Sequence, residues 1–171
     1  MRNGLPVCNQ NVNLGACSIA KEVQLSLEPP LPLEFLVQGT PTSLQGSARS
    51  RDEWQERVRQ AARAVIPLDA WLLLQPLAVT IYIFPATVLP GDIDNRVKHI
   101  LDAMTRVVYL EDRQIHRIVV QKFEPDAIFS FSAASRDLAE AMNSEGPVVY
   151  LRITDDLHEE LQRCSPLPNG A

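Results

Sequence analysis

The sequence predicts a single mixed α/β domain, of the α+β kind, in which helices pack against a mixed β-sheet. Its 171 residues are enough for one domain with a substantial core. Segments with strand character alternate with segments of helical periodicity in the order β-α-β-α-β-α-β. The composition, 46% hydrophobic and 22% charged, is ordinary for a globular protein and excludes collagen-like, coiled-coil and wholly disordered chains.

The first part of the chain predicts an arm, a strand and a helix. Residues 1–30 are rich in Asn, Gln, Gly and Ser and end in a proline-rich run, so we expect a loosely held arm. A strand is expected over Leu33–Gln38, which a Gly-Thr-Pro turn ends. A helix is expected over Arg51–Val65, because Ser50 and Glu53 have capping-box spacing and apolar residues then recur at helical intervals.

The middle of the chain predicts a buried strand and a second helix. The segment Leu77–Phe84 is a continuous run of β-branched and aromatic residues, which indicates a strand covered on both faces. A helix is expected from about Asp94 to Arg106, with a buried stripe made of Val97, Ile100, Leu101 and Met104. Both tryptophans, Trp54 and Trp71, are expected in the core.

The C-terminal part completes the domain. Its expected elements are two strands, a short helix that begins at Ser135, and a terminal helix: Ile115–Phe123, Pro147–Ile153, Ser135–Asn143 and Asp155–Arg163. The predicted domain therefore covers residues 31–163, and residues 164–171 form a tail.

Composition also restricts the function classes. The net charge of −5 is uneven, since residues 124–171 hold three basic and nine acidic residues, so a basic face elsewhere is neither excluded nor supported. The chain has three cysteines and no C-x-x-C pair, which favours reduced thiols over a disulfide framework or a zinc site. No apolar run approaches the roughly 20 residues of a membrane span, and no signal-peptide core follows the N-terminus, so a cytoplasmic protein without a membrane partner is expected.

The informative segment is the D-x-D pair Asp92 and Asp94 with the helix that follows. In an extended chain the two carboxylates point the same way, with Cα atoms about 6 to 7 Å apart, which suits a shared divalent cation. On the helix, Asp94, Lys98 and Asp102 are spaced by four residues and form one polar stripe. The return through Glu111-Asp112 could bring a third carboxylate to the same place.

Three carboxylates and a lysine suit phosphodiester cleavage. Mg²⁺, or Mn²⁺ in its place, prefers oxygen ligands, and paired ions about 3.5 to 4 Å apart can activate the attacking water and stabilise the leaving oxygen. The lysine would offset charge in the transition state. Nearby cations are candidates for phosphate contacts: Arg96, Arg113, Arg117 and Lys122.

Each of these residues also has a structural interpretation. Asp94 could cap the helix, and Lys98 could pair with its i±4 neighbours on a solvated face. Asp102 is expected to be supporting rather than catalytic, because its helical position recedes from Asp92. Glu111-Asp112 could be an ordinary acidic turn, and the basic residues a solvated face.

The spacing of these acidic and basic residues, taken together, is similar to that of a known family. The pattern Asp92-x-Asp94-Asn95-x-x-Lys98-x-x-x-Asp102-Ala103-Met104, followed by Leu110-Glu111-Asp112-x-x-Ile115 and Lys122, resembles the signature of the RusA family of Holliday junction resolvases. The similarity is firm over residues 77–123 and weaker over residues 33–65.

The resemblance implies a RusA-like fold and a Mg²⁺-dependent endodeoxyribonuclease that acts as a homodimer on branched DNA, in recombination and repair. It implies that Asp92, Asp94 and Asp112 bind metal and that Lys98 is the essential lysine, with supporting roles for Asn95, Asp102 and Glu111. A dimer would place two identical sites on a four-way junction. Two rival hypotheses remain: a noncatalytic DNA-binding or regulatory module of the same fold, and a nuclease acting on RNA or unbranched DNA.

Overall fold

The computed structural model describes residues 27–43, 46–125 and 127–159. Strands and helices alternate as predicted: β1 (Leu33–Gln38), α1 (Ala48–Val65), β2 (Leu77–Phe84), α2 (Asp94–Met104), the short 3-10 helix η1 (Asp112–Gln114), β3 (Ile115–Lys122), α3 (Arg136–Met142) and β4 (Val148–Thr154). This confirms the predicted α+β class.

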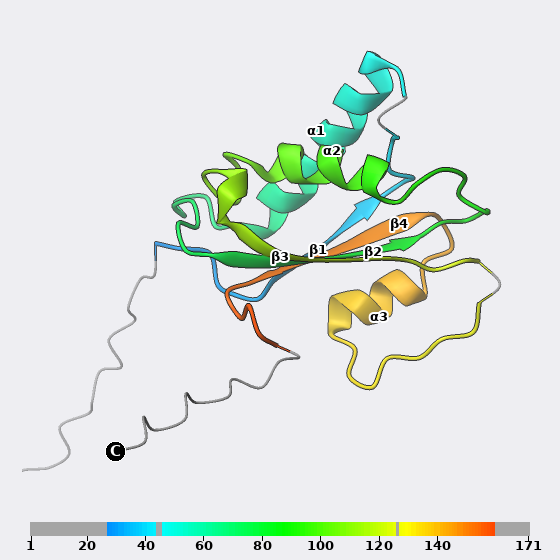
Figure 1. The fold of residues 1–171 in the computed structure, drawn as a ribbon. Helices are drawn as coiled ribbons and strands as arrows, with labels where there is room; N and C mark the ends of the chain where they lie inside the picture. Colours follow the sequence, from blue (N-terminus) through cyan, green and yellow to red (C-terminus); the bar gives the residue numbers. More distant parts are fainter. Residues whose placement is uncertain (1–26, 44–45, 126, 160–171) are drawn as a thin grey trace, which may run out of the picture.

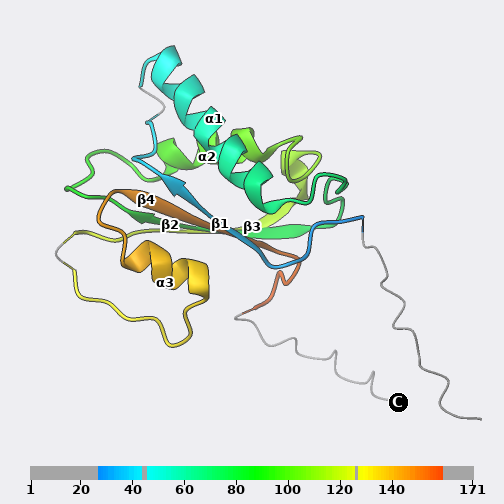
Figure 2. The same cartoon turned by 180° about the vertical axis from the view of Figure 1, so that it is seen from behind.

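The four strands form one mixed sheet in the order β1-β4-β2-β3. β4 is antiparallel to both β1 and β2, whereas β2 and β3 are parallel. A parallel pair needs a crossover connection, and α2 supplies it between β2 and β3. α1 and α2 lie on one face of the sheet and α3 lies on the other (Figures 1 and 2).

The main core lies between the sheet and the layer formed by α1 and α2. It takes every second residue of β2, namely Val79, Ile81 and Ile83, which are at most 1% exposed. A smaller apolar cluster on the other face joins α3 to β4 through Leu138 and Tyr150. Both faces of β2 are therefore covered, which confirms the interpretation of its uninterrupted apolar sequence.

The boundaries of β1 and β2 are those predicted, but α1 begins earlier. The side chain of Ser47 accepts a hydrogen bond from the backbone N–H of Ser50 at 3.1 Å, so Ser47 is the N-cap and the expected capping box at Ser50 is wrong. The cap of α3 is as predicted, with Ser135 accepting from the Leu138 N–H.

Three other expectations differ from the structure or lie outside it. Residues 155–159 form a bend followed by a turn rather than the start of a helix. The rest of the expected terminal helix lies outside the described residues, as do most of the N-terminal arm and all of the tail. Trp54 is buried as expected, but Trp71 is 64% exposed, so its placement in the core is wrong. Within the ranges that the structure describes, no helix has both the length and the apolar character of a membrane span.

Candidate active site

The D-x-D pair lies where the chain enters α2. Gly91 has a positive φ of 85°, and Ile93 already has helical dihedrals, with φ −69° and ψ −38°. The chain is therefore not extended between Asp92 and Asp94, and the expectation that both carboxylates point the same way as on a strand is wrong. Asp94 is not the N-cap either: Ile93 is the cap residue, and Asp94 lies in the first turn, where the helix dipole favours a negative charge.

The polar stripe along α2 is present as predicted. Lys98 Nζ lies 3.0 Å from Asp102 Oδ1, an i,i+4 ion pair on an exposed part of the helix. This hydrogen bond to Asp102 and the negative charges of Asp102 and Asp112 raise the pKa of Lys98 above its ordinary value. The lysine therefore remains an ammonium ion across the neutral pH range.

A tight reversal of the chain returns Asp112 to the end of α2. Arg106 adopts a left-handed φ of 61°, and its backbone N–H donates to the Tyr109 carbonyl at 2.7 Å. The Thr105 hydroxyl lies 2.5 Å from Asp112 Oδ1. It also lies within hydrogen-bonding distance, 3.2 Å, of the Leu101 carbonyl in the last turn of α2. Thr105 therefore links the acidic turn to the helix, a contact that the sequence pattern did not indicate.

Tyr109 stabilises this reversal from the protein core. Its side chain is fully buried, and its hydroxyl donates to the Leu101 carbonyl at 2.9 Å. Burial raises the pKa of this phenol, so it remains neutral and acts as a fixed hydrogen-bond donor. The backbone around Asp112 is thus held by buried contacts, although Asp112 itself is exposed.

One hollow brings most of the predicted site residues together. A depression of about 460 Å³ is lined by the polar residues Asp94, Lys98, Asp102 and Asp112 and by the apolar residues Ile93, Val97, Leu101 and Val120. Three carboxylates and one ammonium group leave its rim with an excess of negative charge. Asp102, expected to recede from the site, lies on this rim as the partner of Lys98.

Other predicted residues lie elsewhere. Asp92 is exposed and is not among the residues that line the hollow, and Asn95 is half-buried in the first turn of α2. Glu111 pairs with Arg113 at 2.5 Å and takes part in the capping box of η1 with Gln114. Among the described residues, no group of three or more His, Cys, Asp or Glu side chains is arranged to hold a metal ion.

Arg96 is a structural residue rather than a surface cation. It is 7% exposed, and its guanidinium donates to the carbonyl of Pro41 and, at 2.6 Å, to that of Pro90. The predicted contact between Arg96 and DNA phosphate is therefore wrong, because the side chain is buried and joins the loop after β1 to the loop before α2. Hydrogen bonds from a buried guanidinium are among the stronger ones in proteins.

The Arg96→Met variant is expected to lower the free energy of unfolding by about 2 to 3 kcal/mol, because two carbonyls lose a charged donor. Arg63→Met is the control: this side chain is 59% exposed and its change is expected to cost less than about 0.5 kcal/mol. Urea denaturation measures both. Equal stability of the two variants would contradict the structural role of Arg96.

The remaining candidate phosphate contacts are placed differently from one another. Arg113 is 82% exposed beside Asp112. Lys122 donates to the Leu89 carbonyl at 3.1 Å and pairs with Glu124 at 2.8 Å. Arg117 lines a pocket on the α3 face of the sheet, away from the hollow, so it is not positioned to contact a phosphate bound there.

Comparison with known families gives a match over the middle of the chain. Residues 46–128 match the family model described as endodeoxyribonuclease RusA. The match covers 83 of the 171 residues, just under half of the chain. The matched segment runs from just before α1 to just beyond β3 and contains every residue that lines the hollow, which confirms the resemblance found in the sequence motif. No curated protein matches the chain.

Proposed function

We propose that this RusA-family protein is a divalent-cation-dependent endodeoxyribonuclease that cuts branched DNA at the hollow beside α2. The observation that carries the proposal is that Asp94, Asp112 and Lys98 line one hollow within the matched segment. The family is one of endodeoxyribonucleases. The dependence on a cation, the roles of the residues and the branched substrate are the proposal.

The charge of the hollow supports a requirement for a cation. A phosphodiester is an anion, and an acidic rim without a counter-ion would repel it. The donors also fit the ion: carboxylate oxygens are hard ligands, and Mg²⁺ is usually bound by only one or two carboxylates together with water and substrate phosphates. Asp94 and Asp112 are therefore sufficient as protein ligands, and Asp92, outside the hollow, is proposed as a supporting acid.

Each side chain then has a distinct task. A bound Mg²⁺ or Mn²⁺ would supply Lewis acidity at the scissile phosphate. Asp94 and Asp112 would hold the ion from two different elements, α2 and η1. Lys98 is an ammonium ion at neutral pH, and its hydrogen bond to Asp102 raises its pKa further, so it is not suited to be a general base. Its ammonium group would instead stabilise negative charge on the phosphate as the bond breaks.

Thr105→Val tests how precisely Asp112 must be placed. The substitution keeps the shape of the side chain but removes the hydroxyl that contacts Asp112. Loss of such an outer contact typically costs about 10- to 100-fold in metal affinity or activity, so we expect the Mg²⁺ concentration for half-maximal cleavage to rise about tenfold. Thr105→Ser retains the hydroxyl and is expected to behave like the unchanged protein; an unchanged Mg²⁺ requirement in Thr105→Val would contradict this role.

A cleavage assay with synthetic DNA tests the proposed activity. Four-way, flap and linear duplexes are incubated with the protein while Mg²⁺ is titrated, and the products are mapped on each strand. We also propose that the protein acts as a homodimer, which would present two identical sites, and we therefore expect paired nicks at symmetric positions on the four-way junction. Binding of DNA without cleavage at any Mg²⁺ or Mn²⁺ concentration would overturn the proposal in favour of a noncatalytic module. Faster cleavage of RNA or linear DNA would overturn the proposal that branched DNA is the substrate.

A further inference from the structure

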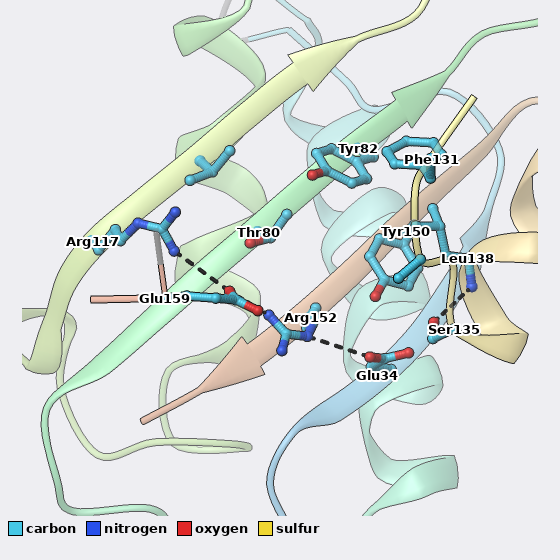
Figure 3. Close-up of a pocket in the computed structure, with 12 residues that line it drawn as sticks. Glu34, Thr80, Tyr82, Arg117, Phe131, Ser135, Leu138, Tyr150, Arg152 and Glu159 are labelled. Carbon is cyan, nitrogen blue, oxygen red and sulfur yellow. Dashed lines mark hydrogen bonds and ion pairs between the residues drawn. The ribbon is translucent and has the colours of Figure 1, made fainter. Parts of the chain in front are cut away.

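A second pocket lies on the face of the sheet opposite the hollow. It has a volume of about 280 Å³, and its walls come from the sheet, from α3 and the segment before it, and from Glu159. Figure 3 shows its floor, where Arg117, Thr80, Arg152 and Glu34 come from the four different strands β3, β2, β4 and β1. Alternate residues of β2 belong to the main core, so this pocket is separated from the candidate active site by the sheet itself.

One end of the pocket already holds an anionic group between two arginines. Glu159 Oε2 lies 2.8 Å from Arg152 Nη1 and 3.8 Å from Arg117 Nη1. Arg152 Nε also lies 3.4 Å from Glu34 Oε1. The hydrogen bond to Glu159 raises the pKa of Arg152, as expected for a guanidinium paired with a carboxylate. Both arginine side chains are mostly buried, at 21% and 23% exposure, which reduces screening by solvent.

The other end of the pocket is aromatic. The rings of Tyr82 and Phe131 are half-buried with centroids 5.4 Å apart, and Tyr82 stacks on Tyr150 with centroids 5.7 Å apart. The side chains of Thr80 and Ser135 also line the pocket and provide hydroxyl groups. The lining thus combines a site for an anion with aromatic side chains and hydroxyl groups, as Figure 3 shows.

We propose that this pocket binds a nucleoside monophosphate, with the phosphate taking the place of the Glu159 carboxylate between Arg117 and Arg152 and the base lying against Tyr82 and Phe131. Arginine pairs recognise phosphate with the same geometry as carboxylate, and bases stack on aromatic rings regardless of sequence. The volume is near the lower limit for ligand pockets, which favours one nucleotide over a longer segment. Glu159 acts as a tethered competitor that the phosphate displaces.

The same chemistry could come from a free nucleotide or from the phosphorylated end of a DNA strand. In either case binding uses none of the acids of the hollow. It is therefore measured without divalent cations, in EDTA, so that failure of the proposed cleavage and failure of this proposal are distinguishable.

Calorimetric titration of the full chain with deoxyadenosine 5′-monophosphate tests the proposal. Glu159→Gln removes the competing charge and is expected to bind the nucleotide about tenfold more tightly than the unchanged protein, the magnitude typical of one charge-assisted contact. Because this is a gain in affinity, a misfolded variant could not produce it. Arg117→Gln is expected to weaken binding by a similar factor, and Arg136→Gln, an exposed cation of α3 that does not line the pocket, is expected to change nothing.

Three further ligands define the outcome. Deoxyadenosine and inorganic phosphate are each expected to bind more weakly than the nucleotide, because each engages only one end of the pocket. A short 5′-phosphorylated oligonucleotide that binds as well as the nucleotide supports a strand end as the source, and one that fails to bind supports the free nucleotide. The proposal is overturned if neither the unchanged protein nor Glu159→Gln binds the nucleotide at millimolar concentration, or if Glu159→Gln shows no gain.

Discussion

Asp94→Asn is expected to reduce DNA strand cleavage by more than about 100-fold while leaving the fold and DNA binding intact. The change removes one of the three carboxylates that share the hollow with Lys98, and one of the two that are proposed to hold the cation. Even an outer residue of a metal site typically accounts for about 10- to 100-fold. Asn keeps the shape of the side chain and one oxygen but loses the charge that holds the cation. Single-turnover cleavage of a four-way junction in Mg²⁺ measures the effect, and gel retardation in Ca²⁺ measures binding.

Asp52→Asn is the matched control, because Asp52 is an exposed acid in α1 that does not line the hollow. Its cleavage rate is expected to equal that of the unchanged protein. Asp112→Asn is expected to be as damaging as Asp94→Asn, and Asp92→Asn less so, because Asp92 lies outside the hollow. Cleavage by Asp94→Asn at the rate of the unchanged protein would contradict the assignment of Asp94 to the active site.

Lys98→Met is expected to lower the cleavage rate about 100- to 1,000-fold, the range seen when one group that stabilises transition-state charge is removed. Its Mg²⁺ requirement is expected to change little, since Lys98 is assigned to the phosphate and not to the ion. The rate in the unchanged protein is also expected to show no titration of this lysine between pH 6 and about 10, because its pKa is raised above the ordinary value of 10.5.

Arg49→Met is a close control for Lys98→Met. Arg49 and Glu53 form an i,i+4 ion pair at 2.8 Å on the exposed surface of α1, just as Lys98 and Asp102 do at 3.0 Å on α2. Neither variant is expected to change the stability of the fold appreciably, since exposed ion pairs contribute little. Only Lys98→Met is expected to lose activity; equal activity of both variants would show that Lys98 has no role in the reaction.

Much of the fold follows from local sequence patterns. β2 was predicted at its observed boundaries because a continuous β-branched and aromatic run has few alternatives to a strand covered on both faces. The cap of α3 was predicted because a serine before a short amphipathic segment has a specific local partner, the N–H three residues later. Such features depend on residues close together in the chain.

Features that local spacing does not determine were not predicted. Ser47 and Ser50 both lie near the start of α1, and the capping-box spacing indicated Ser50 although Ser47 is the cap. Arg96 has a surface-like sequence context, yet carbonyls from two loops, one of them 55 residues away, bury it. Trp71 is exposed although large aromatic residues are commonly buried, because it lies in the loop between α1 and β2.

The candidate site was predicted in part for the same reason. The stripe of Asp94, Lys98 and Asp102 follows from helical periodicity, and it is present. The parallel alignment of Asp92 with Asp94 assumed an extended chain, but the helical conformation begins at Ile93. The contact between Thr105 and Asp112 depends on the left-handed turn at Arg106, and a non-glycine residue gives no indication of such a turn in the sequence.

Titration of the metal-free protein with Mn²⁺, followed by two-dimensional NMR without DNA, tests most directly whether the hollow binds a cation. Mn²⁺ is paramagnetic and broadens the signals of nuclei near it. We expect the amide signals around Asp94 and around Asp112 to broaden together at low Mn²⁺ concentration, and to be spared in both Asp94→Asn and Asp112→Asn. Broadening around only one of the two acids, or the same broadening in both variants, would contradict a shared cation site beside Lys98.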